Sequence, residues 1–262
     1  MSSNLITNLQ QIPSPPQSVS KMGTTEPFAL QVARNQIMGH SVLNINGYQP
    51  AISTTQIALW ELAQAYVYPN SNVTMTLVST SASDTSAVKV TINGLDSNYN
   101  PVSEVVALNG TTGVATVNTY FRINSLVLNA GNNVGTITAA NGGTTYAVIL
   151  PGNGRSQMAI YTVPAGYTFY LNRINAWSGT SLSTGNYVLY NLVTTVNGIT
   201  SSAAQISFEL FVDVHRYAPN SFAAGTDIQF QFTSSSGAQH VAAYVEGYLV
   251  KNDDQTPPVV GV

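Results

Sequence analysis

The pattern of hydrophobic and polar residues is dominated by short alternating runs, which are typical of β-strands. In the first half of the chain these runs predict strands at 73–79, 87–92, 102–108, 113–117, 120–128 and 135–139. Turn sequences lie between them at Asn93-Gly94, Asn109-Gly110 and 141–143. Because Asn-Gly supplies the positive φ values of tight hairpin turns, this half indicates an antiparallel β-sandwich.

A second series of strands follows residues 150–154, whose proline and two glycines mark a domain boundary. The runs there predict strands at 156–162, 168–178, 187–195, 207–215, 227–234 and 240–250. Across 227–233 the alternation is strict and places Ile228, Phe230 and Phe232 on one face. We expect that face to pack in the core of a second sandwich.

Residues 1–27 are polar and contain prolines, so they predict an extended arm without a folded element of its own. Two interpretations stay open: a solvated linker, or a peptide that becomes ordered along a neighbouring subunit. The hydrophobic residues of the arm favour the second interpretation. The candidate assembly residues are Leu5, Ile6, Leu9, Ile12, Pro13, Pro15 and Pro16.

Helical periodicity is limited to 28–34 and 53–68, where the run 57–63 predicts a short helix at most. The chain is therefore predicted to be all-β, with two consecutive antiparallel β-sandwiches of jelly-roll-like type after the arm. The expected divisions are the arm at 1–27, a first sandwich at 28–150, a second at 151–252 and a flexible tail at 253–262.

Charged residues make up 7% of the 262 positions, against about 25% in ordinary soluble domains. Hydrophobic residues, at 44%, are sufficient to form packed cores. Charged residues are depleted at the cores of protein interfaces, where an unpaired ion costs several kcal/mol to desolvate. The scarcity of charge therefore favours a protein built for packing and assembly over an enzyme.

The charge balance and the hydropathy pattern also exclude several partners. The net charge of −3 and the scattered basic residues argue against nucleic acid, which needs clustered Lys and Arg. No run approaches the roughly 18 apolar residues of a membrane span, and residues 1–11 do not resemble a secretory signal. The absence of cysteine excludes disulfides and thiolate chemistry, and suits assembly in a reducing cytoplasm.

Candidate metal ligands are few. The three histidines are His40, His215 and His240, and only His215 has a close acidic neighbour, Asp213, two residues away on the same strand face. Zinc needs at least three protein ligands, so a hydrogen-bonded or exposed pair is the simpler interpretation. Residues 96–100 imitate the start of a calcium loop, but Pro101 replaces its obligatory glycine. An Asx-stabilised turn explains that segment, and no metal or cofactor is expected.

No constellation of catalytic residues stands out, so we do not expect an enzyme. The sequence lacks the Gly-x-Ser-x-Gly elbow of serine hydrolases. Glycoside cleavage would require two carboxylates to converge from among Glu104, Glu209, Asp213 and Glu246. For Glu104 and Arg122, an ion pair or loop caps within the first sandwich is the preferred interpretation.

Six aromatic residues allow three interpretations: core packing, stacking on sugars, or a subunit interface. They are Trp60, Tyr66, Tyr68, Trp177, Tyr187 and Tyr190. Core packing is favoured, because most of them follow strand periodicity.

Two stretches resemble a family of virion structural proteins from marine tailed bacteriophages, including phages of cyanobacteria. The first contains, in order, 28–34 (FALQVAR), 39–41 (GHS), 68–69 (YP), 81–85 (SASDT), 92–100 (INGLDSNYN), 103–104 (SE), 108–112 (LNGTT) and 121–124 (FRIN). The second contains 161–167 (YTVPAGY), 208–210 (FEL) and the strand 240–250. In many relatives a glycine-rich segment near Ser86 is longer. The resemblance implies a non-enzymatic component of a phage particle.

The resulting hypothesis is a capsid decoration or cement protein that stabilises the shell through subunit interfaces. Its expected partners are the major capsid protein or other virion proteins and further copies of itself. A trimer would suit the local three-fold positions of a shell, and the expected location is the virion, assembled in the host cytoplasm. The alternatives are a tail, adaptor or head-fibre component with glycan receptor binding, a carbohydrate-binding adhesin and, last, a glycan hydrolase.

Overall fold

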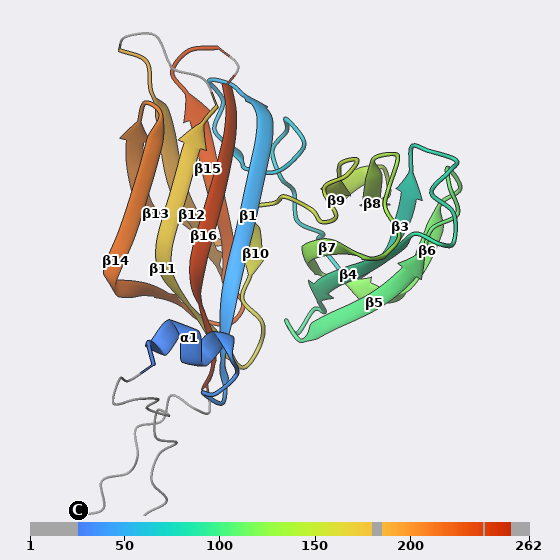
Figure 1. The fold of residues 1–262 in the computed structure, drawn as a ribbon, viewed down its shortest axis with the longest axis horizontal. Coiled ribbons are helices and arrows are strands. Elements are labelled where there is room, and N and C mark those ends of the chain that lie inside the picture. Colours follow the sequence, from blue (N-terminus) through green and yellow to red (C-terminus); the bar gives the residue numbers. More distant parts are fainter. Residues whose placement is uncertain (1–25, 180–184, 238, 253–262) are drawn as a thin grey trace, which may run out of the picture.

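A computed structural model describes residues 26–179, 185–237 and 239–252. The chain folds into two antiparallel β-sandwiches that lie side by side (Figure 1). Among the described residues the single helix is α1 (Phe28–Ala33), which agrees with the short helical pattern at 28–34. The prediction of an all-β sandwich fold is confirmed. Across the part of the chain described here, no helix is long and apolar enough to cross a membrane.

The larger sandwich is a jelly roll. One sheet has the order β1 (His40–Ile52), β16 (Gln239–Lys251), β11 (Tyr167–Ser178) and β14 (Phe211–Phe222). The facing sheet has the order β10 (Ile160–Thr162), β15 (Asp227–Ser234), β12 (Val188–Val196) and β13 (Ile199–Phe208), and β2 (Ile57–Ala58) also pairs with β15. If β1 and β10–β16 are counted as eight successive strands, the sheets read 1-8-3-6 and 2-7-4-5. This order is the double Greek key of a jelly roll.

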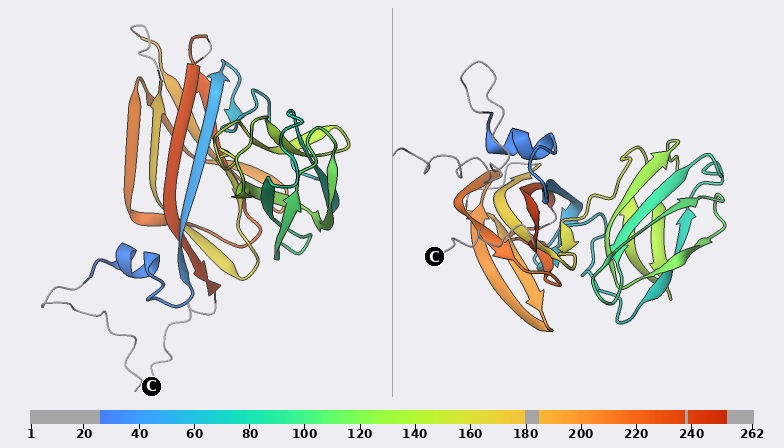
Figure 2. Two further views of the ribbon diagram at one scale, coloured as in Figure 1. Left: turned by 45° about the vertical axis from the view of Figure 1, so that its right-hand side comes forward. Right: turned by 90° about the horizontal axis from the view of Figure 1, so that it is seen from below.

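The smaller sandwich is inserted between β2 and β10 of the jelly roll. One of its sheets has the order β6 (Val114–Tyr120), β3 (Val73–Ser79), β8 (Ile137–Asn141) and β9 (Thr144–Ile149). The other has the order β5 (Pro101–Ala107), β4 (Lys89–Leu95) and β7 (Arg122–Ala130). Its strand order is not that of a jelly roll, so the jelly-roll prediction applies to one of the two sandwiches. Figure 2 shows the two units from two further directions.

The structure divides the chain differently from the expected boundary near residue 150. Strand β1, which lies within the expected first sandwich of 28–150, pairs along its length with β16 near the other end of the chain. Ile45 and Ile52 of β1 are buried in the jelly-roll core, and this burial holds the strand in that sheet. The jelly roll is therefore formed by two chain segments, one before and one after the continuous segment that forms the smaller sandwich.

The two crossings between the sandwiches form a wall that both cores share. In the outgoing crossing Leu59 packs in the jelly-roll core, whereas Ala58 and Trp60 pack in the core of the smaller sandwich. In the returning crossing the alternation is the same: Ala159 faces the jelly roll and Ile160 the smaller sandwich. Residues 57–60 are buried on both faces and are apolar throughout, which explains why the run 57–63 lacked strand alternation and looked helical. The helix predicted there is wrong; a two-residue strand and bends take its place.

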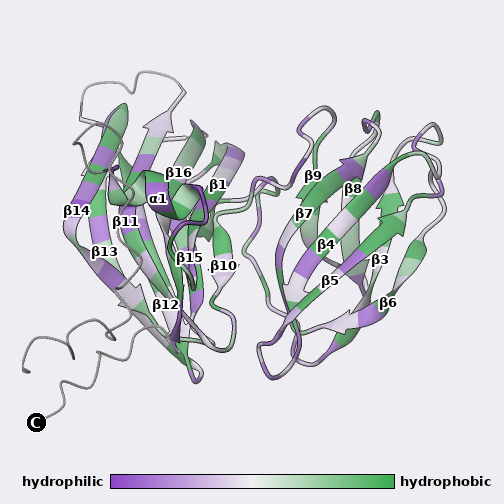
Figure 3. Ribbon diagram, turned by 60° about the horizontal axis from the view of Figure 1, so that its bottom comes forward, coloured by the Kyte–Doolittle hydropathy of each residue, from purple (hydrophilic) through white to green (hydrophobic). Residues whose placement is uncertain are grey.

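The local predictions succeeded where alternation was clean. The run 227–234 coincides with β15, and Ile228, Phe230 and Phe232 are fully buried. Figure 3 shows the same alternation of hydrophobic and polar positions along many strands. The predicted strand 207–215 is wrong, because the chain turns at residues 209–210 between β13 and β14 without a glycine or proline.

Asn93-Gly94 is not a hairpin turn, because it lies inside β4 at a register shift against β7. A side chain at Gly94 would collide with the carbonyl oxygen of Arg122. Glycine is therefore needed here because the backbones of β4 and β7 approach closely, and not because the residue adopts a positive φ.

Candidate functional site

The candidate functional features lie on the two lateral sides of the jelly roll. On one side the smaller sandwich covers the edge formed by β1 and β10. On the other side the edge strands β13 and β14 lie side by side and are joined by the turn at residues 209–210 (Figure 1). The covered side is called the seam here and the other the open side.

A buried ion pair joins the sandwiches at the seam. The Arg122 guanidinium donates two hydrogen bonds to the Asp227 carboxylate, at 2.8 and 2.9 Å. Thr162 donates a third to that carboxylate at 2.6 Å, and Arg122 also donates to the carbonyl oxygen of Phe121. The guanidinium carbon lies 4.5 Å from the centre of the Tyr68 ring. Because both charges are fully bonded, the pair fixes the two sandwiches relative to each other.

Further hydrogen bonds reinforce this arrangement. Asn124 of the smaller sandwich both donates to and accepts from the backbone of Thr162, at 3.0 and 2.9 Å. The backbone N–H of Ala165 donates to the carbonyl oxygen of Tyr99 at 2.8 Å. The seam is therefore a bonded interface and not a flexible linker.

The expected ion pair between Glu104 and Arg122 does not form, because Arg122 is turned to Asp227. The Glu104 carboxylate instead accepts hydrogen bonds from two backbone N–H groups. One oxygen lies 2.9 Å from the nitrogen of Val117, and the other lies 2.9 Å from the nitrogen of Asn118. Glu104 is on β5 whereas Val117 and Asn118 lie inside β6, so this carboxylate joins the two sheets of the smaller sandwich and does not cap a loop.

Glu61 is a buried carboxyl in the outgoing crossing. One of its oxygens accepts a hydrogen bond from the backbone N–H of Gln157 in the returning crossing, and the other has no partner. Burial raises the pKa of Glu61 to about 7, which outweighs the lowering effect of that hydrogen bond. The seam therefore contains a group that changes its charge near neutral pH.

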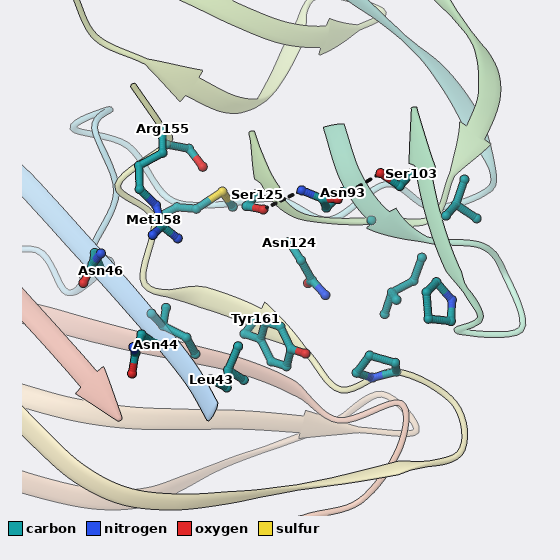
Figure 4. Close-up of a pocket in the computed structure, with 17 residues that line it drawn as sticks. Leu43, Asn44, Asn46, Asn93, Ser103, Asn124, Ser125, Arg155, Met158 and Tyr161 are labelled. Atoms are coloured by element: carbon teal, nitrogen blue, oxygen red, sulfur yellow. Dashed lines mark hydrogen bonds between the residues drawn. The ribbon is translucent and has the colours of Figure 1, made fainter. Parts of the chain in front are cut away.

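A pocket of about 280 Å³ lies in the seam, between β1 and the strands of the smaller sandwich (Figure 4). Its polar lining consists of the side chains of Asn44, Asn46, Asn93, Ser103, Asn124, Ser125, Arg155, Ser156 and Tyr161. Arg155 is the single charged residue in this lining. The sequence analysis did not find this site, because no local motif marks it.

The open side exposes hydrophobic residues at both ends of β13. Ile199, which begins the strand, is 74% exposed, and Leu210, just beyond its end, is 52% exposed. Beside Leu210, Trp177 of β11 lies opposite Phe211 of β14, and both side chains are largely exposed. Exposed apolar side chains therefore lie at each end of this edge, and such residues are candidates for an interaction surface.

The six aromatic residues singled out in the sequence divide between core and surface. Trp60, Tyr66 and Tyr190 are buried, as the packing interpretation expects. Trp177 and Tyr187 are exposed, at 43% and 45%. The structure adds Phe211 and the fully exposed Tyr217 to the surface group, which the sequence analysis did not single out.

The candidate metal and acid–base residues do not form a ligand set. Asp213 is paired with Arg173 at 2.8 and 2.9 Å, and the guanidinium holds the pKa of that carboxyl below its usual value. His215 stacks on Tyr217 instead. Among the described residues there is no cluster of three His, Cys, Asp or Glu side chains.

Of the four acidic candidates, the structure brings Asp213 and Glu246 together around the Arg173 guanidinium, and it keeps the other two apart from them. Glu246 lies 3.8 Å from the same Arg173, whereas Glu209 is in the β13–β14 turn and Glu104 is in the smaller sandwich. Asp96 accepts hydrogen bonds from the backbone N–H groups of Asn98 and Asn100, at 2.8 and 2.9 Å. This geometry is the expected Asx-stabilised turn.

The assembly residues expected in the arm, Leu5, Ile6, Leu9, Ile12, Pro13, Pro15 and Pro16, lie outside the described residues. The arm's involvement in assembly therefore stays a prediction.

Comparisons with known proteins assign no family. No protein-family model and no curated protein matches the chain. Among solved structures, a mutant VP2 protein of infectious bursal disease virus, in derived T=1 particles, matches 81% of this chain and 78% of its own, with 11% identity and a TM-score of 0.14. The VP2 subviral particle of the same virus matches 82% of each chain, with 9% identity and a TM-score of 0.13. Superpositions this poor carry no argument, so function is inferred from the surfaces of the molecule.

Proposed function

We propose that this chain is a non-enzymatic structural protein of a phage particle, a decoration or cement protein that binds the capsid shell. The observation that carries the proposal is the open side, where an unprotected strand edge lies between exposed hydrophobic residues. The scarcity of charge and the jelly-roll fold agree with it, although jelly rolls serve as both capsid and lectin domains.

The two edge strands of the open side differ in how they are protected. Strand β14 carries Asp213, Arg216 and Pro219. The charge of Arg216 lies close enough to the buried Tyr190 to lower the pKa of its hydroxyl, against the larger opposing effect of burial. Charges, proline and inward-pointing ions are the devices by which proteins prevent edge-to-edge pairing. Strand β13 has ten residues without a charge or a proline, and one bulge near Ala203 interrupts its pairing with β12.

Apart from this bulge, which also weakens edge pairing, β13 has none of these protective features, so its edge is suited to strand pairing with another subunit. Antiparallel pairing of two β13 strands around a two-fold axis would bring Ile199 of one copy near Leu210 of the other, so the apolar ends would cover each other. The partners that follow from the proposal are a further copy of this chain and the major capsid protein. The proposed location is the virion.

The assembly surface is tested with the double variant Ile199→Asp and Leu210→Asp. We expect it to lower the oligomeric state of the purified protein in light scattering and to reduce its incorporation into particles. The matched control is Val117→Asp, since Val117 is 88% exposed but lies on the smaller sandwich. If the double variant assembles as the unaltered chain does, the open side is not the assembly surface.

The decoration role is tested by the number of copies in purified virions. A decoration protein should be present in proportion to the capsid protein, and shells that lack it should melt at a lower temperature. Copy numbers that match those of tail proteins, or shells that are equally stable without it, would overturn the role.

A second candidate is a tail, adaptor or head-fibre component that binds a host glycan. The exposed pair Trp177 and Phe211 favours it, because exposed aromatic rings can stack on sugars. Loss of binding to host envelope glycans on Trp177→Ala, with unchanged particle assembly, would support this candidate over the decoration role.

A further inference from the structure

The seam pocket is the other candidate site of the molecule, and its lining is positively charged although the chain as a whole is acidic. The formal net charge is −3, yet Arg155 is the single charged residue in the pocket lining. No carboxylate of the described residues lies within 4 Å of the Arg155 side-chain nitrogens. Its Nε is buried and has no hydrogen-bond partner.

The backbone around Arg155 is held firmly in place. Arg155 forms an isolated β-bridge with Val127, and the backbone N–H of Ser156 donates to the carbonyl oxygen of Leu126 at 2.9 Å. The Arg155 guanidinium extends from a firmly held backbone and has no carboxylate partner among the described residues, so it is suited to an external anion. Because a guanidinium matches a carboxylate in shape and in hydrogen-bond geometry, a carboxylate is the anion that fits best.

The rest of the lining favours hydroxyl groups on the same ligand. Asn44 is exposed and Asn46 half-buried on β1, and both line the pocket, where their amides can both donate and accept hydrogen bonds. Asn93 is oriented by Ser103 and Ser125, through bonds of 3.0 and 3.2 Å (Figure 4). Several amides and hydroxyls around one cation suit a polyhydroxylated acid better than a bare anion.

The size of the pocket limits the ligand further. About 280 Å³ is at the lower end of ligand pockets and accommodates a single sugar ring, not a nucleotide. On the jelly-roll side Tyr161 lies against the pocket, and burial raises the pKa of its hydroxyl above the usual value, so it stays neutral. A neutral phenol adds a hydrogen-bonding group without repelling a carboxylate.

We propose that the seam pocket binds an acidic monosaccharide unit of the uronic-acid or sialic-acid class, with its carboxylate on Arg155 and its hydroxyls on the amides of Asn44 and Asn46. The site exists only where the two sandwiches meet, and the Arg122–Asp227 pair keeps its walls in register. The proposal does not depend on the assembly role, because no residue of the open side lines the pocket.

The test uses the full chain and three probes, observed by protein NMR. D-glucuronate carries both the ring and the carboxylate, glucose has the ring alone, and acetate has the carboxylate alone. We expect glucuronate to shift the resonances of seam residues with a dissociation constant on the order of millimolar. Glucose and acetate should bind at least tenfold more weakly. Equal binding of acetate would overturn recognition of the sugar, and equal binding of glucose would overturn recognition of the charge.

Two variants locate the site. Arg155→Gln should weaken glucuronate binding tenfold or more while the melting temperature stays unchanged, and Asn46→Ala should weaken it less. The matched control is Lys89→Gln, since Lys89 is exposed on β4 and has no carboxylate partner in the part of the chain that the structure describes. Unchanged binding in Arg155→Gln, or the same loss in Lys89→Gln, would overturn the assignment. The assembly variants at Ile199 and Leu210 leave the pocket intact, so failure of either proposal is seen separately.

Discussion

The two lateral sides of the jelly roll differ in whether their edge strands are covered. At the seam, β1 and β10 are covered by the inserted sandwich, and the contact contains a buried, fully bonded ion pair between Arg122 and Asp227. On the open side β13 remains uncovered, uncharged and flanked by exposed Ile199 and Leu210. The end strands of the same sheets are thus covered by the chain itself at one side and left uncovered at the other.

This difference shows where the few charges of the chain are used. A buried ion pair is costly to form and very costly to break, so it suits a contact that must keep one geometry. An edge intended for a partner is better without ions, because each ion would have to be desolvated on binding.

The largest effect is expected for Asp227→Ala, which leaves the Arg122 guanidinium buried without its partner. Breaking a buried pair in this way costs about 3–5 kcal/mol of the free energy of unfolding, measured by urea denaturation. The control is Asp213→Ala, which removes an exposed partner of Arg173 and should cost much less. Equal losses in the two variants would show that the seam pair is not a rigid contact.

The second effect depends on pH and concerns Glu61. Its pKa is about 7 in the folded chain and 4.5 for the free side chain, so the folded state binds more protons between these values. The contribution of Glu61 to the free energy of unfolding is therefore largest below pH 4.5 and is lost as pH rises through 7, by roughly 3 kcal/mol. Glu61→Gln should remove that slope and be more stable than the unaltered chain at pH 8. If the two chains show the same pH dependence, Glu61 is ionised in the folded state.

The third effect concerns the close packing of the wall that the two cores share. A side chain at Gly47 of β1 would meet the Cβ of Ala159 at 2.5 Å and a methyl group of Leu59 at 2.8 Å. Gly47→Val should therefore overpack both crossings and lower the free energy of unfolding by about 1–3 kcal/mol. Calorimetry provides the measurement, and an unchanged melting temperature would mean that the crossings can move apart.

The smallest effect on stability is expected on the open side, for Ala203→Lys in β13. Ala203 is exposed, so the free energy of unfolding of the isolated subunit should change by less than about 0.5 kcal/mol. The oligomeric state should nevertheless fall, because a lysine on a strand edge blocks pairing with another strand. If the oligomer persists in this variant, the assembly surface lies elsewhere on the molecule.

Features encoded over a few neighbouring residues were determined by the sequence itself. The strict alternation at 227–233 defines β15 and its buried face, because side chains of a strand point to opposite sides. The oxygen-rich segment that begins at Asp96 defines a turn, since its carboxylate reaches backbone N–H groups two and four residues away. The all-β fold class and the lack of charge follow in the same way from local composition.

The contacts that create the two candidate sites were decided only by the tertiary structure. Ser41 and Leu249 are paired strand residues 208 positions apart, and Arg122 meets Asp227 across 105 positions. Nothing local distinguishes such partners from other residues of the same type. The apolar crossing at 57–60 was ambiguous for a related reason: a strand buried between two cores loses the alternation that would identify it. Long-range burial therefore placed the seam, its pocket and the open edge, whereas local side-chain geometry determined the strands that form them.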